Sequence, residues 1–306
     1  MIRLGLCCKF KDEPIRFRTT TATYLLRISR DEACAKLSAL CLANTQALRQ
    51  AIEYCAAHGI GSFRINSQIL PVKTHPQAGY DIANLPDGDA ICAGFLAAGE
   101  RAREQGVRLT FHPDQFVLLN SPRPEVTERA IADLAYQAAV ADWVGADVVN
   151  IHGGGVYGDK PSALARLVAT IQALPAAIRA LLTLENDDRS YTPTDLLPVC
   201  RQTGIPLVYD AHHHRCLPDG LSTAEATVAA LTTWDREPLC HISSPKHGWD
   251  GPDPRPHHEF IDCADIPAGW RDLDLTVEVE AKAKEAAIAG LRATLLRDRW
   301  KLWEAK

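Results

Sequence analysis

The chain has 306 residues, of which 46% are hydrophobic and 23% are charged, so it can bury a sizeable core and is not a disordered polyelectrolyte. Its formal net charge of −5 excludes a global positive field for nucleic acid, so any DNA contact needs a local cationic patch or bound metal ions. The sequence shows no secretory leader, no membrane span and no C-x-x-C pair among its ten cysteines, so we expect reduced cysteines in a cytoplasmic protein.

Apolar segments of strand length alternate along the chain with segments of helical periodicity. The predicted strands are residues 3–8, 61–65, 107–111, 147–151, 181–184, 206–209, 239–242 and 273–279. One predicted helix begins at Ser29, a second is capped by Asn44, and a third ends at about Gln105. Further helices are predicted over residues 125–144, 162–177, 194–202, 223–231, 258–262 and 281–297. Eight strands, each followed by a connection with room for a helix, predict a closed (β/α)8 TIM barrel over residues 1–306 as a single domain. A doubly wound open sheet is the alternative.

Imidazole and carboxylate side chains recur where the predicted strands end. Because strand periodicity is two, the polar residues of each strand share the face opposite its apolar residues, and that polar face should point into the barrel. The residues delivered to one rim in this way are His112, His152, Glu185, Asp210, His241 and Glu280. His213 lies just past the sixth strand, and either His257 or His258 lies in the loop after the seventh.

These rim residues predict a metal cluster. Three carboxylates packed together without cations would repel one another and lose their hydration. Imidazole and carboxylate ligands without a thiolate suit Mn²⁺, Zn²⁺ or Fe²⁺ rather than Ca²⁺, and there are enough of them for two or three ions. Such clusters clamp the attacking and leaving oxygens of a phosphodiester. Asp187 and Asp188, which follow Glu185 directly, are interpreted as a solvated turn or a helix cap.

Competing catalytic motifs are weaker. Residues 152–155 (HGGG) resemble an esterase oxyanion loop, but the sequence contains no G-x-S-x-G nucleophile and no H-E-x-x-H helix. The glycine run could bind a phosphate through backbone N–H groups, although such a run alone is a weak signal.

Five blocks, taken together and in order, resemble the signature of the UV damage endonuclease family. They are residues 111–121 (FHPDQFVLLNS), 150–155 (NIHGGG) with 157–160 (YGDK), 184–188 (LENDD), 241–245 (HISSP) and 280–285 (EAKAKE). The resemblance runs from residue 5 to about residue 285. It implies a TIM barrel similar to endonuclease IV and a manganese-dependent cluster of up to three ions. It also implies nicking of duplex DNA directly 5′ to a pyrimidine photoproduct, with 3′-hydroxyl and 5′-phosphate products.

The resemblance also implies roles for individual residues. The implied metal ligands are His112, His152, Glu185, Asp210, His213, His241, His257 and Glu280, with Glu185 and Glu280 as the catalytic carboxylates. His257 is preferred to His258 because the family pattern has an aromatic residue and isoleucine three and four positions later, which here are Phe260 and Ile261. Gln115 and Phe116 match the residues that the family inserts into the duplex at the lesion; a strand end packed under a loop is the alternative.

Arg64 and Lys160 are candidates for phosphate contacts, and an exposed or salt-bridged side chain is the alternative for each. The sequence departs from the family pattern at three positions: Leu239 stands where a lysine is frequent, Leu6 where an aromatic residue is frequent, and Asn66 where serine is more usual. These departures bear on lesion preference and metal occupancy more than on reaction type.

Two other functions remain open at this stage. One is a sugar isomerase or epimerase on a similar metal-containing barrel, which would leave Gln115 and Phe116 unexplained. The other is a damage-binding protein that does not cut. For the preferred function we expect a monomer that acts on damaged double-stranded DNA away from membranes.

Overall fold

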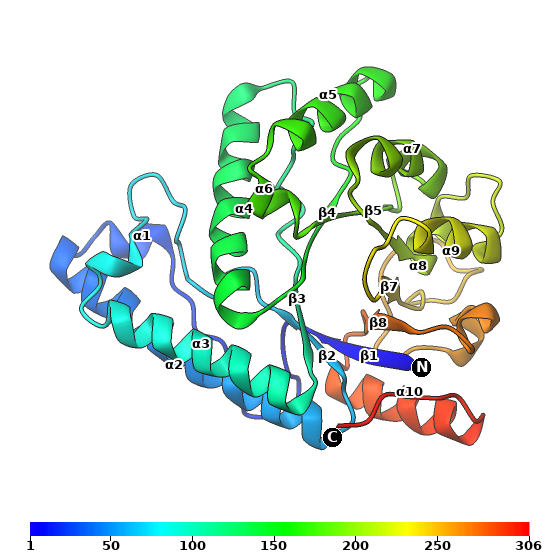
Figure 1. Ribbon diagram of the computed structural model, residues 1–306, viewed down its shortest axis with the longest axis horizontal. Coiled ribbons are helices and arrows are strands. Elements are labelled where there is room, and N and C mark those ends of the chain that lie inside the picture. The colour runs from blue at the N-terminus through cyan, green and yellow to red at the C-terminus, as the bar shows by residue number, and fades with distance from the viewer. Residues whose placement is uncertain (306) are drawn as a thin grey trace.

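The computed structural model describes residues 1–305, and they form a closed barrel of eight parallel strands surrounded by helices (Figure 1). Strand order around the barrel follows chain order, from β1 to β8, and β8 pairs with β1. The strands are β1 Ile2–Cys7, β2 Ser62–Ile65, β3 Arg108–Phe111, β4 Val148–His152, β5 Leu182–Glu185, β6 Leu207–Asp210, β7 Leu239–Ile242 and β8 Leu275–Val279. This confirms the single-domain (β/α)8 fold and excludes the open sheet.

Helices cover the outside of the barrel in all but one of its connections (Figure 1). They are α1 Ala22–Leu25, α2 Arg30–Ala57, α3 Gly88–Gln105, α4 Pro124–Val144, α5 Lys160–Ala173, α6 Ala176–Arg179, α7 Pro193–Thr203, α8 Ala211–Cys216, α9 Thr223–Leu231 and α10 Glu285–Arg297. Between β7 and β8 the chain makes only the 3₁₀ turns Cys263–Asp265 and Ala268–Trp270, so the helical piece predicted at residues 258–262 is wrong. Among the described residues, no helix has the length and apolarity needed to cross a bilayer.

Three predicted helix boundaries are also corrected. Asn44 caps no second helix: it lies buried inside the continuous α2, where its side chain bonds the backbone of Arg18 and Ile69 instead of competing with the helix. The helix predicted at residues 162–177 breaks after Ala173 because Pro175 holds Leu174 in an extended conformation. The last helix begins four residues later than predicted, after Lys284 at a φ of 52°.

The two faces of the strands separate apolar from polar side chains, as the alternation predicts. Leu182 and Leu184 of β5 join the large core between strands and helices, whereas Thr183 and Glu185 are buried on the other face. Leu239 belongs to a separate small cluster with Val148 and Val208. The position where the family frequently has lysine is therefore occupied here by a buried apolar contact.

Parallel register brings the polar strand ends together. His152 is the register partner of Glu185, and Asp210 is that of His241. His241 in turn pairs with Glu278 of β8. Because the strands are parallel, their carboxyl ends all lie at one end of the barrel.

The helix packing gives a test of the fold. A Cβ added at Gly99 of α3 would lie 2.6 Å from the Cα and the carbonyl oxygen of Val144 in α4, so Gly99→Ala should destabilise the protein by about 1–3 kcal/mol through overpacking. Gly290 of α10 is exposed and nothing lies within 4 Å of a Cβ there, so Gly290→Ala should stabilise by about 0.5–1 kcal/mol. Thermal unfolding of both variants measures the difference. Equal shifts in Tm would contradict the close packing of α3 on α4.

Candidate metal centre

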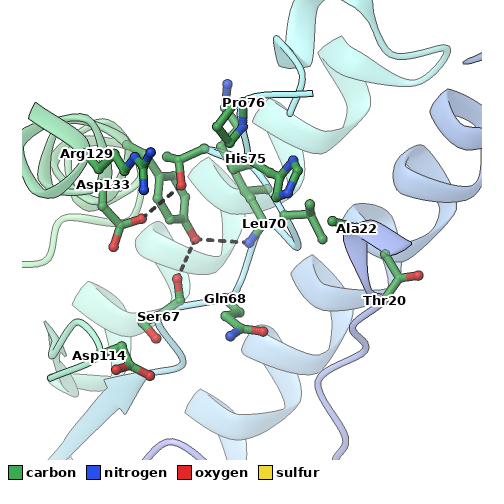
Figure 2. Close-up of a pocket in the computed structure, with 14 residues that line it drawn as sticks. Thr20, Ala22, Ser67, Gln68, Leu70, His75, Pro76, Asp114, Arg129 and Asp133 are labelled. Carbon is green, nitrogen blue, oxygen red and sulfur yellow. Dashed lines mark hydrogen bonds between the residues drawn. The ribbon is translucent and has the colours of Figure 1, made fainter. Parts of the chain in front are cut away.

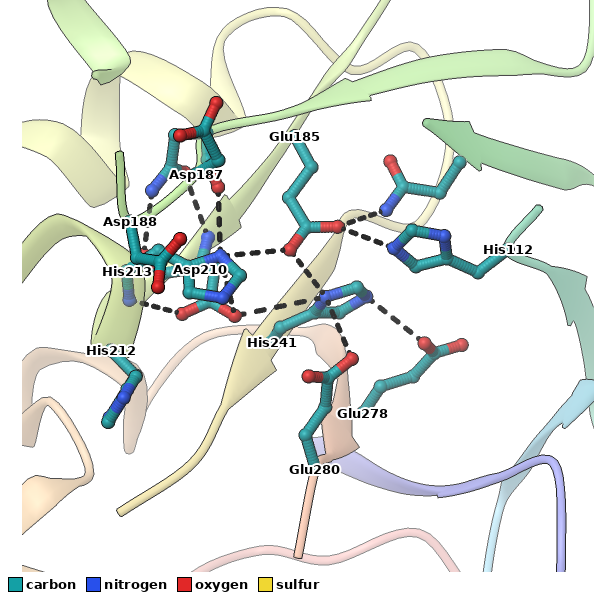
Figure 3. A network of polar contacts seen from close by, with 12 residues as sticks. His112, Glu185, Asp187, Asp188, Asp210, His212, His213, His241, Glu278 and Glu280 are labelled. Atoms are coloured by element: carbon teal, nitrogen blue, oxygen red, sulfur yellow. Dashed lines mark hydrogen bonds and ion pairs between the residues drawn. The ribbon is translucent and has the colours of Figure 1, made fainter. Parts of the chain in front are cut away.

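The predicted ligands lie close together at the carboxyl ends of the strands. Figure 3 shows six of them: His112, Glu185, Asp210, His213, His241 and Glu280. Three groups have donor atoms that lie within 4.8 Å of one another: His112, His152 and Glu185; then Glu185, Asp210 and His213; then Asp210, His241 and Glu280. Glu185 belongs to the first two groups and Asp210 to the last two. Seven of the eight predicted ligands are therefore brought into one continuous cluster.

The eighth predicted ligand, His257, lies at the edge of this cluster. Its Nδ1 is 3.6 Å from Oε2 of Glu280. His258 is exposed instead, and its Nδ1 accepts a hydrogen bond from the backbone N–H of Phe260. Of the two histidines that the sequence left open, the structure thus places His257 beside the other ligands.

Glu185 is the centre of the cluster. Its side chain is 1% exposed, Nε2 of His112 lies 2.9 Å from Oε2, and Nδ1 of His213 and of His241 both lie 3.2 Å from Oε1. Burial alone would raise the pKa of Glu185, but the surrounding imidazoles, His241 and His152 foremost, hold this pKa well below its ordinary value. The carboxylate is therefore charged and attracts cations.

The histidines respond to the carboxylates in the opposite sense. Burial would lower the pKa of His213 and of His241, yet carboxylates outweigh burial and raise both pKa values well above the ordinary one: Asp210 and Glu185 for His213, and Glu185 and Glu278 for His241. For His152 burial dominates and lowers its pKa. The buried carboxylates at the rim are therefore stabilised by nearby positive charge, which either protons on the histidines or metal ions can supply.

The donor set fits divalent ions. Oε1 of Glu185, Oδ2 of Asp210 and Nδ1 of His241 are all buried without a hydrogen-bond partner among the described residues. Unpartnered buried polar atoms are costly and need an explanation. These three face one another, so cations held between them would satisfy all three at once.

The polar interior of the barrel supports the rim from below. Asn150 of β4 donates a hydrogen bond to Oε2 of Glu185, and Thr183 donates one to the side-chain carbonyl oxygen of Asn150 at 2.9 Å. The guanidinium of Arg64 lies 2.6 Å from Glu280 and 3.3 Å from Glu278. Asn150 and Glu278 were not predicted as site residues, although the two-residue periodicity that indicated His152 and Glu280 places Asn150 on the face of His152 and Glu278 on the face of Glu280.

The two predicted phosphate contacts are both paired with carboxylates. The Arg64 side chain is 9% exposed and lies against two glutamates in the interior, which agrees with the salt-bridged alternative stated for this residue. Lys160 at the start of α5 donates a hydrogen bond to Asp195 at 2.8 Å and remains partly exposed. Its contact with phosphate stays a prediction.

Asp187 forms the turn that the sequence indicates, and Asp188 lies beside it at the surface. The Asp187 carboxylate accepts the backbone N–H groups of Arg189, Ser190 and Tyr191. Burial raises its pKa despite these hydrogen bonds. The side chain of Asp188 is 22% exposed and lies 3.8 Å from Arg189. Neither aspartate belongs to the groups of donor atoms described above.

Gln115 and Phe116 project from the loop after β3. Both are exposed, and Phe116 is 74% exposed, which rejects the alternative of a strand end packed under a loop. A cavity of about 180 Å³ is lined by Gln115, Leu118, His152, Gly154 and residues 187–190. It connects this exposed loop directly with a predicted metal ligand.

The glycine run after His152 is held by side chains through its carbonyl oxygens and the N–H of Gly155. Nδ2 of Asn120 donates to the carbonyl oxygens of Gly153 and Gly155, and the hydroxyl of Tyr191 donates to Gly155. Gly154 has a φ of 93°, and a Cβ there would lie 2.3 Å from Oδ1 of Asn120. The run therefore fixes the end of β4, and with it His152.

A larger pocket of about 460 Å³ lies between the loop after β2 and helix α4 (Figure 2). It is lined by residues such as Gln68, His75, Arg129 and Asp133, but it contains none of the predicted metal ligands. Asp114, next to Gln115, is its nearest link to the rim. We therefore place no chemistry in this pocket.

Comparisons with known proteins agree with the geometry. The chain is 39% identical to the UV DNA damage endonuclease of Deinococcus radiodurans over 304 residues, covering 95% of this chain and 94% of the relative. It is 36% identical to that of Bacillus velezensis over 286 residues, covering 90% and 87%. The crystal structure of SacUVDE superposes with a TM-score of 0.87 at 26% identity, over 98% of this chain and 100% of that one.

More distant structures share the fold alone. Endonuclease IV from Thermus thermophilus superposes with a TM-score of 0.61 at 17% identity, over 97% and 98% of the two chains. A D-psicose 3-epimerase from Clostridium cellulolyticum superposes with a TM-score of 0.57 at 15% identity, over 97% and 90%. The model of the family described as UV-endonuclease UvdE matches residues 2–301, and the chain belongs to this family.

Proposed function

We propose that this protein is a DNA repair endonuclease that nicks duplex DNA directly 5′ to UV photoproducts by multi-metal-ion hydrolysis. The observation that carries the proposal is the continuous cluster of seven donor residues, in which Glu185 and Asp210 are each shared between two groups. Water adds across the bond between phosphorus and O3′, so the products carry a 3′-hydroxyl and a 5′-phosphate. Other lesions that distort the helix fall within the same scheme.

The metals proposed are two or three Mn²⁺ ions, with Zn²⁺ or Fe²⁺ as alternatives of similar ligand preference. They would be held by the three groups of donors and His257. Bound there, divalent ions activate the attacking water and neutralise charge on the leaving oxygen. Glu185 and Glu280 are the catalytic carboxylates in this proposal because both face His241, at 3.2 and 3.6 Å from its Nδ1.

Recognition of damage is assigned to the loop after β3. An exposed aromatic ring such as Phe116 can stack where two bases have been separated, while the amide of Gln115 offers a donor and an acceptor to the displaced base. A photoproduct weakens stacking and lowers the cost of bending and flipping. Recognition would then depend on how easily the DNA deforms at the lesion, so we expect the protein to act on a broad range of lesions. Lys160 is kept as a contact to the phosphate backbone.

The decisive experiment is a cleavage assay on a duplex that carries one photoproduct. With Mn²⁺ we expect a single nick immediately 5′ to the lesion and no cleavage of the undamaged duplex. Binding without a nick would support a damage-binding protein instead. Neither binding nor nicking would favour a sugar epimerase, for which the epimerase structure offers similarity of fold alone.

The loop residues give a prediction on affinity. Phe116→Ala should weaken binding to the damaged duplex by about 1–3 kcal/mol, or roughly five- to hundredfold, because one stacking contact is lost. Val228 of α9 is 64% exposed, and Val228→Ala is the matched control that removes a similar exposed apolar group from an outer helix. Fluorescence anisotropy measures both. An unchanged affinity for Phe116→Ala would contradict the proposed insertion of the Phe116 ring between separated bases.

The sharing of ligands gives a prediction on metal content. Asp210→Asn should lose more bound Mn²⁺ than His112→Gln, because Asp210 serves two groups and His112 serves one. Oδ1 of Asp210 already accepts the backbone N–H of His213 at 2.7 Å, so the amide can keep that cap. His258→Gln, at the exposed neighbour of His257, is the control and should retain all ions. Elemental analysis after dialysis against Mn²⁺ measures the content; equal losses for Asp210→Asn and His112→Gln would speak against shared ligands.

A further inference from the structure

Beneath the ligand His241 lies a second carboxylate that the proposed chemistry does not use. Glu278 of β8 is 1% exposed and sits one step further into the barrel than Glu280 (Figure 3). Its Oε2 lies 3.0 Å from Nε2 of His241. An ionised carboxylate buried in a barrel is expensive unless its neighbours compensate it, so its presence needs a physical reason.

Glu278 is held in place from two sides. The hydroxyl of Thr110 in β3 donates a hydrogen bond to Oε1. Nη1 of Arg64 in β2 lies 3.3 Å from Oε2, and its Nη2 donates to Glu280. The carboxylate cannot turn away from His241 without leaving the cation of Arg64 half-paired in the interior.

The two nitrogens of His241 face opposite environments. At 3.0 Å a carboxylate oxygen repels a nitrogen lone pair and attracts an N–H, so this contact favours the proton on Nε2. On the other side, Nδ1 faces Glu185 at 3.2 Å, Glu280 at 3.6 Å and Asp210 at 4.0 Å. Neither ring nitrogen has a geometrically satisfied hydrogen bond among the described residues, but only Nδ1 faces the space between these three carboxylates, where a cation could use its lone pair.

The two ring nitrogens of His112 also have different partners, but the one that faces away from the cluster contacts a backbone oxygen instead of a carboxylate. Its Nδ1 lies 3.0 Å from the backbone carbonyl oxygen of Pro113, which can accept a hydrogen bond from an N–H there, while Nε2 points to Glu185. Metal-bound histidines in general donate their second N–H to a carboxylate or a carbonyl group, which fixes the tautomer and makes the coordinating nitrogen more basic. The Glu278 carboxylate contacts the second ring nitrogen of His241, as the carbonyl oxygen of Pro113 contacts that of His112.

We propose that Glu278 is a positioning residue of the metal centre. Held by Thr110 and Arg64, it keeps His241 in the tautomer whose Nδ1 lone pair faces the cation site shared with Asp210 and Glu280. The inference rests on the proposed metal cluster. It adds to that cluster a residue outside the ligand set, whose substitution changes metal affinity without removing a ligand.

The test compares two identical substitutions inside one barrel. Glu278→Gln removes the charge that faces His241. Glu237→Gln is the matched control, since Glu237 also pairs with an arginine, Arg3 at 2.8 Å, and accepts from Thr276, the residue two before Glu278 on β8. Titration calorimetry of chelator-treated protein with MnCl₂ should show a roughly 10- to 100-fold weaker Kd for at least one ion in Glu278→Gln, the usual cost of losing such a partner, and no change in Glu237→Gln.

A spectroscopic readout separates positioning from a general loss of stability. In protein labelled with ¹⁵N-histidine and loaded with diamagnetic Zn²⁺, His241 should show its proton on Nε2 and coordination through Nδ1. A His241→Ala variant assigns the signal. If Glu278→Gln fails to fold, Thr110→Val replaces it: this variant only releases Oε1 of Glu278 and should weaken Mn²⁺ binding several-fold.

The proposal is overturned if His241 carries its proton on Nδ1 in the loaded protein. It is equally overturned if the folded Glu278→Gln variant binds Mn²⁺ with unchanged number and affinity. A protein that shows the expected metal binding but does not nick damaged DNA refutes the proposed function and leaves this inference standing. Absence of metal binding in the unsubstituted protein refutes both.

Discussion

The structure depends on one electrostatic requirement: carboxylates gathered at the end of a closed barrel must be matched by positive charge. Glu185, Asp210 and Glu280 converge there with little access to water. Attraction between opposite charges is strong in such a setting, and so is the cost of leaving a charge alone. Imidazoles, one arginine and the donor atoms left without partners are arranged around this requirement, which is why the rim is suited to several cations rather than to one.

The barrel meets this requirement through its register and its unusual interior. Parallel pairing sets His152 beside Glu185 and Asp210 beside His241, so ligands far apart in sequence become neighbours without any loop having to carry them. TIM barrels commonly fill their interiors with branched apolar side chains. Here much of the interior is polar and buried, with Arg64, Thr110, Asn150 and Glu278 under the rim, while the apolar contacts of Leu239 form a separate small cluster.

The fold and most of the ligand set could be predicted from the sequence because both depend on short-range periodicity. Alternation along β8 was enough to separate apolar from acidic faces, and eight repeats of strand and helix were enough to indicate closure. The pairing of side chains between different strands could not be predicted from periodicity, because periodicity describes each strand separately. The sequence left Arg64 open between a phosphate contact and a salt-bridged side chain, because its sequence neighbours do not reveal that Glu278 and Glu280 lie within reach. The helix break predicted at Asn44 failed for a similar reason: its tertiary partners, Arg18 and Ile69, lie elsewhere in the chain.

The buried position of Arg64 limits how this family member can diverge. Its guanidinium has two carboxylate neighbours and little solvent, so exchanging the arginine for a neutral residue leaves two carboxylates in the protein interior without this cation. These positions are consequently expected to vary in concert: a lineage that discards the arginine must neutralise a glutamate in the same evolutionary step. Such co-variation would be traceable in sequences alone, as a correlated triplet spanning the second and eighth strands.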